Sequence, residues 1–324
     1  MATMQRAIKV LTLIVASILV GACHEGFSDD TTNNNNNQIP QDDTVYMTIV
    51  AESHSRTGLA IYGSNVNWLE GDRIVVIENG CSHTTSTGAT IDDSGRARFD
   101  VSFAKREDSN GFTYNAIYPA EHTSFDDGVN IECVKVTLPA QQHATTASFD
   151  PKADILVAKR TTSSTQPTEL NIRFERLVAI GAIILEDMPS NSKIDSLTIS
   201  LDDNFTLAGE NIINCIDGEI AEYGHAHPSS LVKIIYDTPH DASKPVFFTC
   251  NPITLNEGDE FTITVPTTDD ATHKQRVVIQ RGDSLKLKAG ELSTIHVDMS
   301  TKDDNEDNNE EDNDEDNDEE VGDD

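Results

Sequence analysis

The chain has 324 residues, with 56 acidic and 23 basic side chains, and its formal net charge is -33 with histidine neutral. This balance argues against a nucleic-acid partner, because a phosphate backbone is bound by clustered Lys and Arg. The hydrophobic share of 37% is enough for one large or two ordinary domains and too small for a protein with many membrane spans.

The first 22 residues have the pattern of an export signal. Arg6 and Lys9 precede an uncharged stretch, residues 10–22, which is shorter than the roughly 20 residues that a membrane span needs and fits a signal peptide. The stretch ends in Leu19-Val20-Gly21-Ala22-Cys23, which resembles a bacterial lipobox. We therefore expect a lipoprotein signal peptide over residues 1–22 and attachment of lipid, palmitate included, at Cys23. An ordinary secretory signal with a stray cysteine is the alternative.

Residues 23–43 predict a flexible tether behind the lipid. They contain Glu25, the run Ser28-Asp29-Asp30 and five consecutive asparagines from Asn33 to Asn37, and they cannot bury enough apolar area to fold. An acidic patch directly after a lipidated cysteine resembles the surface-export signal of lipoproteins in Bacteroides-like bacteria. We expect a lipid anchor in the outer membrane and exposure at the cell surface, with a periplasmic location as the alternative.

From residue 44 onward the hydrophobic residues recur with a period of two, which is typical of strands. Val45, Met47, Ile49 and Ala51 alternate with polar or mixed residues. A second alternating run, residues 97–103, follows a turn cluster at residues 92–95 and predicts a hairpin. Further strands are expected at Arg73–Ile77, Phe112–Tyr118, Val129–Leu138, Ile172–Leu185, Leu197–Leu201, Leu231–Tyr236, Val246–Cys250, Phe261–Val265, Arg276–Ile279, Leu285–Leu287 and Ser293–Met299. Many short strands without a helical period predict an all-β protein of antiparallel sandwiches.

The polar stretch at residues 158–169 has the composition of a linker or a long loop. It places a domain border between residues 165 and 166, with an N-terminal β-sandwich over 44–165 and a C-terminal one over 166–301. Residues 302–324 form an acidic tail, in which 15 acidic residues and no basic one stand between Asp303 and Asp324. We expect this tail to be disordered. Its Asp312-x-Asp314-x-Asp316 run lacks the glycine of a calcium loop, where Asn317 stands instead.

Four cysteines of the body, Cys81, Cys133, Cys215 and Cys250, are candidates for disulfides in an exported chain. A pair within each predicted domain would join Cys81 to Cys133 and Cys215 to Cys250. Free, buried thiols are the alternative, since a single cysteine often serves as a small core residue.

Six pieces of the chain, in this order, resemble fimbrillin-like proteins, the pilus-subunit superfamily of Bacteroides-like bacteria. They are Ser53–Thr57, Asn67–Ile74 with the pattern Trp-x-x-Gly-Asp-x-Ile, Ala116–Ala120, Leu138–Gln141, Phe149–Pro151 with Leu156–Lys159, and Arg173–Leu177. The match covers residues 44–185 well. The Trp68 motif also has a structural interpretation of its own: Trp68 offers a large apolar surface, Gly71 suits a tight turn, and Asp72 can accept backbone N–H groups.

The resemblance implies two tandem transthyretin-like sandwiches and, in polymerising members, assembly with other fimbrial subunits by strand addition. There, a protease cuts after an arginine near the start of the first domain, the first strand leaves, and a neighbour's strand takes its place. In this chain Arg56 would be the processing site, Val45–Ala51 the removable strand and Ser293–Met299 a candidate donor. The acidic tail is a departure from the family, whose chains usually stop near the last strand.

No sequence pattern points to catalysis, a cofactor or a metal. The chain has no G-x-G-x-x-G, P-loop, H-E-x-x-H or G-x-S-x-G motif. The pair His225 and His227, and Cys81 with His83, lack further ligands at metal spacing. The expected function is therefore that of a non-enzymatic fimbrial or accessory subunit with a role in adhesion. The alternative is a monomeric surface lipoprotein that binds a glycan or a host ligand.

Overall fold

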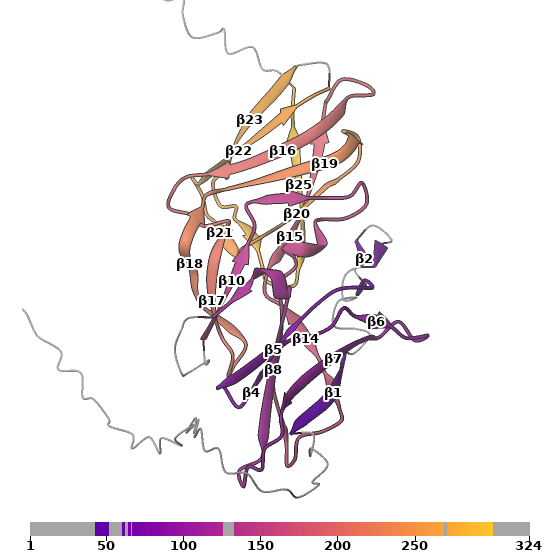
Figure 1. The fold of residues 1–324 in the computed structure, drawn as a ribbon. Helices are drawn as coiled ribbons and strands as arrows, with labels where there is room; N and C mark the ends of the chain where they lie inside the picture. Colours follow the sequence, from indigo (N-terminus) through magenta and orange to yellow (C-terminus); the bar gives the residue numbers. More distant parts are fainter. Residues whose placement is uncertain are drawn as a thin grey trace, which may run out of the picture. The chain divides into compact units, whose positions relative to one another are not determined.

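The computed structural model describes residues 43–51, 60–61, 64–65, 67–125, 133–268 and 271–300, which form strands and two short 3-10 helices (Figure 1). The strands before residue 165 are β1 (Thr44–Ala51), β2 (Ala60–Ile61), β3 (Ser64–Asn65), β4 (Val75–Glu78), β5 (Ser82–Thr85), β6 (Thr90–Ile91), β7 (Ala97–Ala104), β8 (Phe112–Tyr118), β9 (Thr123–Ser124), β10 (Cys133–Leu138), β11 (Gln141–His143) and β12 (Leu156–Ser163). The later strands are β13 (Glu169–Ile172), β14 (Phe174–Arg176), β15 (Ala179–Glu186), β16 (Lys193–Leu201), β17 (Ala208–Asn214), β18 (Glu219–Ser229), β19 (Leu231–Asp241), β20 (Val246–Cys250), β21 (Ile253–Leu255), β22 (Glu260–Pro266), β23 (Thr272–Val278), β24 (Leu285–Leu287) and β25 (Leu292–Asp298). The helices are η1 (Ala120–His122) and η2 (Pro151–Ala153). The prediction of an all-β protein is confirmed.

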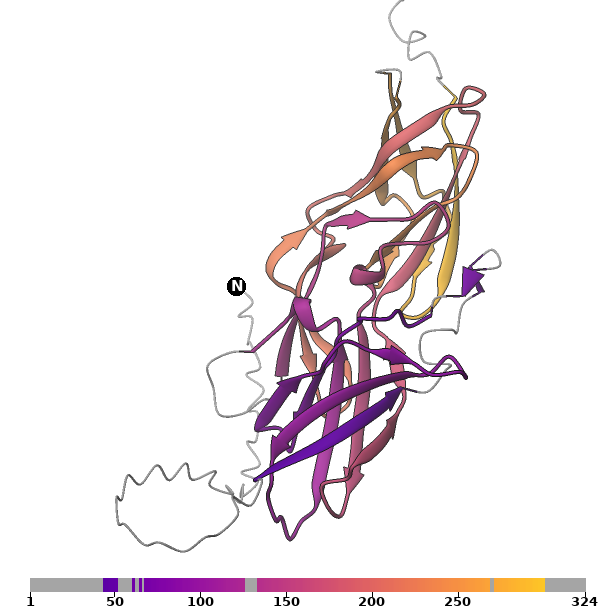
Figure 2. The same ribbon diagram turned by 45° about the vertical axis from the view of Figure 1, so that its right-hand side comes forward.

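Two sheets form the first sandwich. Sheet 1 has the order β13-β1-β7-β6, and sheet 2 has the order β14-β12-β8-β4-β5. The alternation predicted for residues 97–103 is the inner face of β7, whose odd-numbered side chains are buried. Ile49 and Phe99 of sheet 1 share one buried cluster with Tyr114 and Phe174 of sheet 2. The indigo strand β1 lies beside β7 in this layer (Figure 2).

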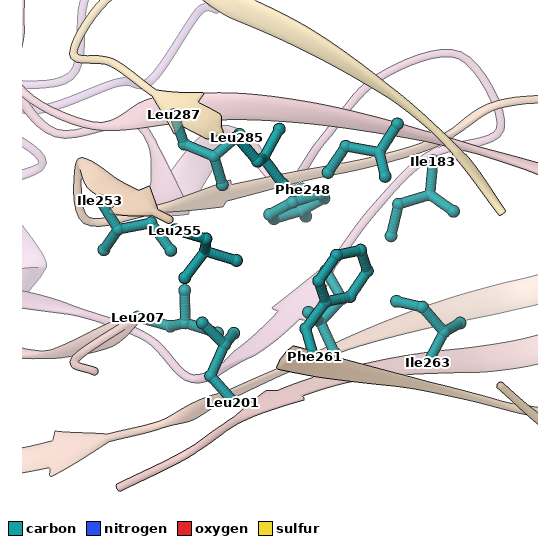
Figure 3. A pocket seen from close by; sticks show the side chains of 12 residues that line it. Ile183, Leu201, Leu207, Phe248, Ile253, Leu255, Phe261, Ile263, Leu285 and Leu287 are labelled. Carbon is teal, nitrogen blue, oxygen red and sulfur yellow. The ribbon is translucent and has the colours of Figure 1, made fainter. Parts of the chain in front are cut away.

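The second sandwich packs sheet 4, with the order β11-β19-β16-β22-β23, against sheet 5, with the order β20-β15-β25. Ile263 and Phe261 of β22 point toward Phe248 of β20 and Ile183 of β15 across the interior (Figure 3). The space between these side chains amounts to about 10 Å³, which is room for one water molecule at most. This interior is a packed core.

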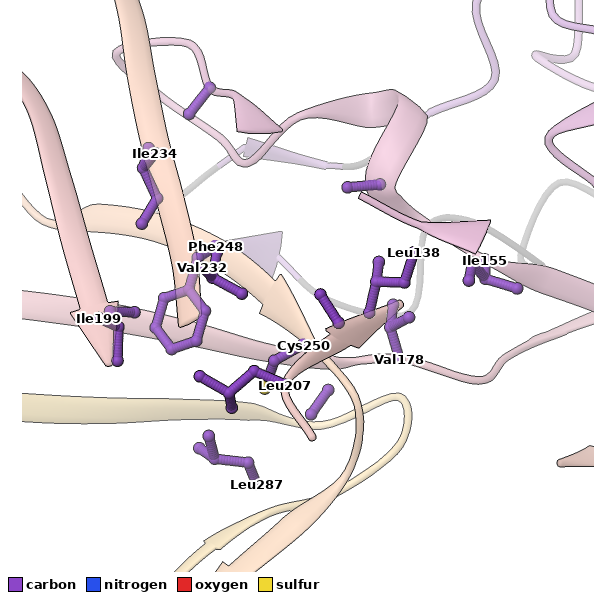
Figure 4. Close-up of a cluster of buried hydrophobic side chains, with 14 of the residues drawn as sticks. Leu138, Ile155, Val178, Ile199, Leu207, Val232, Ile234, Phe248, Cys250 and Leu287 are labelled. Atoms are coloured by element: carbon purple, nitrogen blue, oxygen red, sulfur yellow. The ribbon is translucent and has the colours of Figure 1, made fainter. Parts of the chain in front are cut away.

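Sheet 3, with the order β18-β17-β10-β9, covers the second face of sheet 2. Ile117 and Val157 of sheet 2 belong to the same buried cluster as Val136 and Ile213 of sheet 3. That cluster also includes Ile199 and Ile263 of the second sandwich, and part of it is shown in Figure 4. The second face of sheet 2 is therefore joined to the core of the second sandwich through sheet 3, whereas the interior of the first sandwich forms a buried cluster of its own.

Strand pairing crosses the predicted border between residues 165 and 166. Two strands that follow the border pair with strands that precede it: β13 pairs with β1, and β14 pairs with β12. Two further strands that precede the border pair with later ones: β10 pairs with β17, and β11 pairs with β19. The linker predicted over residues 158–169 is wrong as far as Ser163, because β12 continues through its polar residues and pairs there with β8. The transthyretin-like identity of the two sandwiches stays a prediction. In the part of the chain that the structure describes, no helix is long and apolar enough to span a membrane.

Candidate functional site

The strand that the sequence singled out as removable, β1, lies in the interior of sheet 1. It pairs antiparallel with β7 along its whole length, from Thr44 opposite Ala104 to Ala51 opposite Ala97. On its other side only residues 48–51 pair, in parallel, with β13. The first half of β1 is thus held by one neighbour and the second half by two.

The inner side chains of β1 fill the core of the first sandwich. Met47, Ile49 and Ala51 are buried, whereas Tyr46 is 67% exposed on the outer face. Burial of a large aliphatic side chain is worth about 1.5–3 kcal/mol, so Met47 and Ile49 contribute substantially to the stability of the sheet. Removal of β1 would leave a row of apolar positions along β7.

Trp68 lies in the same core, 4% exposed. Its ring makes edge-on contacts with Phe99 and Phe174 at centroid distances of 5.2 Å and with Tyr118 at 5.3 Å. These three rings come from β7, β14 and β8, so Trp68 bridges both sheets. Edge-to-face aromatic pairs add about 0.5–1.5 kcal/mol each beyond the burial of area.

Asp72 and Gly71 build the turn behind Trp68. The Asp72 carboxylate accepts the Leu69 N–H at 2.8 Å and the Tyr118 hydroxyl at 3.1 Å. Gly71 has a φ of +86°, which favours glycine, and its N–H donates to the Ala89 carbonyl at 3.0 Å. Each of these contacts stabilises the turn that carries Trp68.

The predicted donor segment, residues 293–299, is mostly β25, an edge strand of sheet 5. It pairs in parallel with β15, from Leu292 opposite Ile180 to Asp298 opposite Glu186. On its inner face Val297 and the following Met299 are buried. β25 completes the second sandwich, so its release would expose part of that core.

Two of the predicted site residues, Cys23 and Arg56, lie outside the described residues, as does the acidic tail over residues 302–324. Lipidation, processing and the properties of the tail stay predictions.

The structure forms neither of the two disulfides considered for the body, because Cys133, Cys215 and Cys250 are thiols. Cys215 follows β17 of sheet 3 and Cys250 ends β20 of sheet 5, and both are buried. Burial, with a smaller effect of Cys133 and Asp217, raises the pKa of Cys215 to about 12. Burial also raises the pKa of Cys250. Such thiols are unreactive core residues.

The histidines singled out in the sequence are dispersed. His225 and His227 lie on β18, and His225 pairs with Glu222 at 3.2 Å. His83 stacks on Phe125 with ring centroids 3.8 Å apart. Within the described ranges, no three His, Cys, Asp or Glu side chains are grouped so that they could hold a metal ion.

A buried carboxylate at the end of the first sandwich was missed from the sequence. Glu78, fully buried, forms an ion pair with Arg106 and accepts the Tyr114 hydroxyl at 3.1 Å and the Gln166 side-chain amide at 2.9 Å. Burial and the neighbouring Glu78 charge raise the pKa of Tyr114. The next residue to Arg106, Lys105, donates its N–H to the Asp43 carbonyl at 2.6 Å, so this network anchors the end of the sandwich where β1 begins.

No model of a protein family matches the sequence, and no curated protein matches it either. Among solved structures, the chain is similar to a "putative cell adhesion protein" of Bacteroides uniformis, with a TM-score of 0.50 and 14% identity over 80% of this chain and 94% of that one. A protein of the same description from Bacteroides ovatus has a TM-score of 0.50 and 15% identity over 78% and 92%. The tip fimbrial protein Mfa3 of Porphyromonas gingivalis has a TM-score of 0.41 and 10% identity over 80% and 96%. The chain has the fold of the two Bacteroides proteins.

Proposed function

We propose that the chain is a non-enzymatic, lipid-anchored protein of the outer bacterial surface that acts in adhesion as a fimbrillin-like subunit or accessory subunit. It joins other fimbrial subunits by exchange of β1 for a strand of a neighbour. The adhesion role is taken from the proteins that share its fold. The lipid anchor rests on Cys23 and the polar tether behind it.

The observation that carries the proposal is the position of β1. It is the first strand of the body, it follows the tether, and only the segment around Arg56 connects it to the rest of the sandwich. A cut after Arg56 would leave β1 attached by main-chain hydrogen bonds and by its inner side chains alone. A strand with the same alternation could then take its place, because main-chain bonds supply affinity and the inner side chains supply specificity.

The alternative, a monomer that binds a glycan or a host ligand, has less support in the structure. Glycan sites usually present aromatic platforms. Among the described residues the exposed aromatic side chains are Tyr46 and Tyr223. They lie on β1 in sheet 1 and on β18 in sheet 3, and not together on a set of loops.

The test is limited digestion of the chain lacking residues 1–23 with an arginine-specific protease, followed by N-terminal sequencing and gels without heating. A new N-terminus at Thr57 together with heat-sensitive ladders is the expected result. Addition of a peptide with the sequence of residues 44–51 should suppress the ladders, because it competes for the vacated place in sheet 1.

Two controls accompany this test. Arg56→Ala should abolish both the new N-terminus and the ladders, and a peptide in which Ile49 is replaced by Asp should not compete. A cut chain that stays monomeric and ignores the peptide would overturn strand exchange and favour the monomeric adhesin.

A further inference from the structure

One histidine of the second sandwich is fully enclosed. His240 of β19 is 0% exposed, and its ring lies on the ring of Tyr236 with a centroid distance of 4.4 Å and an interplanar angle of 7°. The two residues flank an irregularity in the pairing of β19 with β16, where Ile194 stands opposite His240 and Ser196 opposite Ile235. A titratable ring is thus built into the end of a core strand.

The hydrogen bonds of His240 determine where an added proton would go. The Nε2 atom lies 3.3 Å from the Lys244 carbonyl, and since a carbonyl only accepts, Nε2 carries the hydrogen of the neutral ring. The Nδ1 atom and the Tyr236 hydroxyl are buried and have no hydrogen-bond partner. A second proton must go to Nδ1, where it would be a buried N–H on a charged ring without an acceptor.

The charged groups around the ring act in both directions. Asp241, next to it, favours the protonated ring, whereas Lys244 of the following turn and Lys193 of β16 oppose it. The Asp241 carboxylate is bound to the Ser243 hydroxyl at 2.7 Å and to Lys193 Nζ at 3.0 Å. The neighbouring strand of β19 in sheet 4 is β11. His143 of β11 lies 3.7 Å from Asp237 of β19, and both of these side chains are exposed. Desolvation dominates and lowers the pKa of His240.

The turn after His240 lines one side of a cleft in the second sandwich. Asp241, Ala242 and Ser243 line one side of it, and the β15–β16 loop, residues 187–192, lines the other. The Ala242 N–H donates to the Ser192 carbonyl at 3.0 Å, and the Lys244 carbonyl is held by His240. The same turn is therefore bonded to the His240 ring at one end and to the opposite loop at the other.

We propose that the β19–β20 turn, residues 242–245, is an acid-sensitive element that opens when His240 takes up a proton. The charged ring leaves its place on Tyr236 to reach water, its bond to the Lys244 carbonyl is lost, and the cleft between the turn and the β15–β16 loop widens. The open form binds the proton more tightly than the closed form does, so acid favours the open form.

The test is amide hydrogen exchange of the full chain at pH 7.5 and 5.5, corrected for the intrinsic effect of pH on exchange. Below the ordinary pKa of 6.5, protection of residues 241–246 should fall by up to about tenfold per pH unit, because one proton is taken up on opening. His240→Phe keeps the ring on Tyr236 and cannot be protonated, so its protection should be independent of pH. Tyr236→Phe should keep the pH response.

His143→Gln is the matched control, since it removes an exposed histidine from the strand beside β19, and it should respond like the unaltered chain. An NMR titration supplies a readout that does not depend on the variants: the His240 ring should stay neutral, with hydrogen on Nε2, at a pH where the exposed histidines are protonated. Two results would overturn the proposal. One is a loss of protection from pH 7.5 to 5.5 that is as large in His240→Phe as in the unaltered chain, and the other is a His240 ring that becomes protonated while the turn stays protected.

Discussion

The buried ion pair of Arg176 with Asp154 joins β14 to the end of η2. Arg176 Nε lies 2.6 Å from Asp154 Oδ1 and Arg176 Nη2 lies 3.0 Å from Asp154 Oδ2, with side-chain exposures of 5% and 0%. The guanidinium carbon also lies 6.0 Å from the centroid of the Phe149 ring. Removal of one partner leaves an uncompensated charge in the interior, which is far more costly than the loss of an exposed pair.

We expect Asp154→Ala to lower the free energy of unfolding by about 3–5 kcal/mol, measured by urea denaturation. Glu175→Ala removes the exposed pair of Glu175 with Lys159, whose atoms are 2.9 Å apart, and should cost about 1 kcal/mol or less. Equal costs for the two variants would show that Arg176 finds a substitute partner or reaches water.

The residues that sequence analysis could identify were those whose interactions are local. Asp72 bonds to the N–H of Leu69, three residues away, and the spacing of Trp68, Gly71 and Asp72 alone suggested a turn. Glu78 and Arg106 meet across 28 positions. The one available signal was a carboxylate at the end of the apolar run of β4, and nothing in the sequence named its partner.

At the scale of a strand, Gly181 of β15 shows how tightly sheet 5 is packed. A Cβ at this position would lie 2.1 Å from Cε1 of the Phe248 ring on β20, so the ring occupies the place of a side chain. Overpacking of this kind typically costs about 1–3 kcal/mol.

Gly181→Ala should therefore lower the melting temperature, because the Phe248 ring must leave its rotamer or push the two strands apart. When Phe248→Leu is also present, Gly181→Ala should lower the melting temperature by less than it does in the chain with phenylalanine at position 248. The double-mutant cycle measures this coupling, and additive effects would show that the ring moves aside freely.

Strands with a continuous or an alternating apolar pattern were predicted well, and strands without such a pattern were not. β8, β20 and β24 have the bounds expected from the sequence. β18 was missed, because its inner residues lack a period of two and three register shifts interrupt its pairing with β17. The polar half of β12 was taken for a linker, since its side chains from Lys159 onward are partly or fully exposed while its backbone still pairs with β8.

At the scale of the whole body, the continuous cluster through sheets 2, 3 and 4 predicts cooperative unfolding of residues 43–300. Trp68 is the only tryptophan, so tryptophan fluorescence reports on the first sandwich, whereas far-UV circular dichroism reports on all strands. The two signals should give the same midpoint in urea. Separate midpoints would show that the interior of the first sandwich, which contains Trp68, unfolds independently of the cluster through sheets 2, 3 and 4.

A fragment of residues 44–165 should accordingly fail to fold on its own. It lacks β13 and β14, which complete sheets 1 and 2, and β17 and β18, which cover sheet 2. Narrow dispersion of its amide NMR signals is the expected result, and a folded fragment would restore the border predicted from the sequence.

The all-β class could be predicted because strands such as β1, β7 and β8 each carry an apolar pattern within one short stretch, whereas the border could not. Pairings such as Val136 with Asn211 depend on contacts between distant residues that a pattern within one stretch of sequence does not record.

The location of the two neighbours of β1 has a consequence for the order in which the chain folds. Thr48 pairs with Asp100 on one side and with Glu169 on the other, so the first strand to be synthesised must wait until both later strands exist. Closing such long loops slows the step that places β1. During that delay its row of apolar side chains is exposed beside an unfilled position in sheet 1, and any strand of similar pattern that arrives from another chain competes with it for the same place.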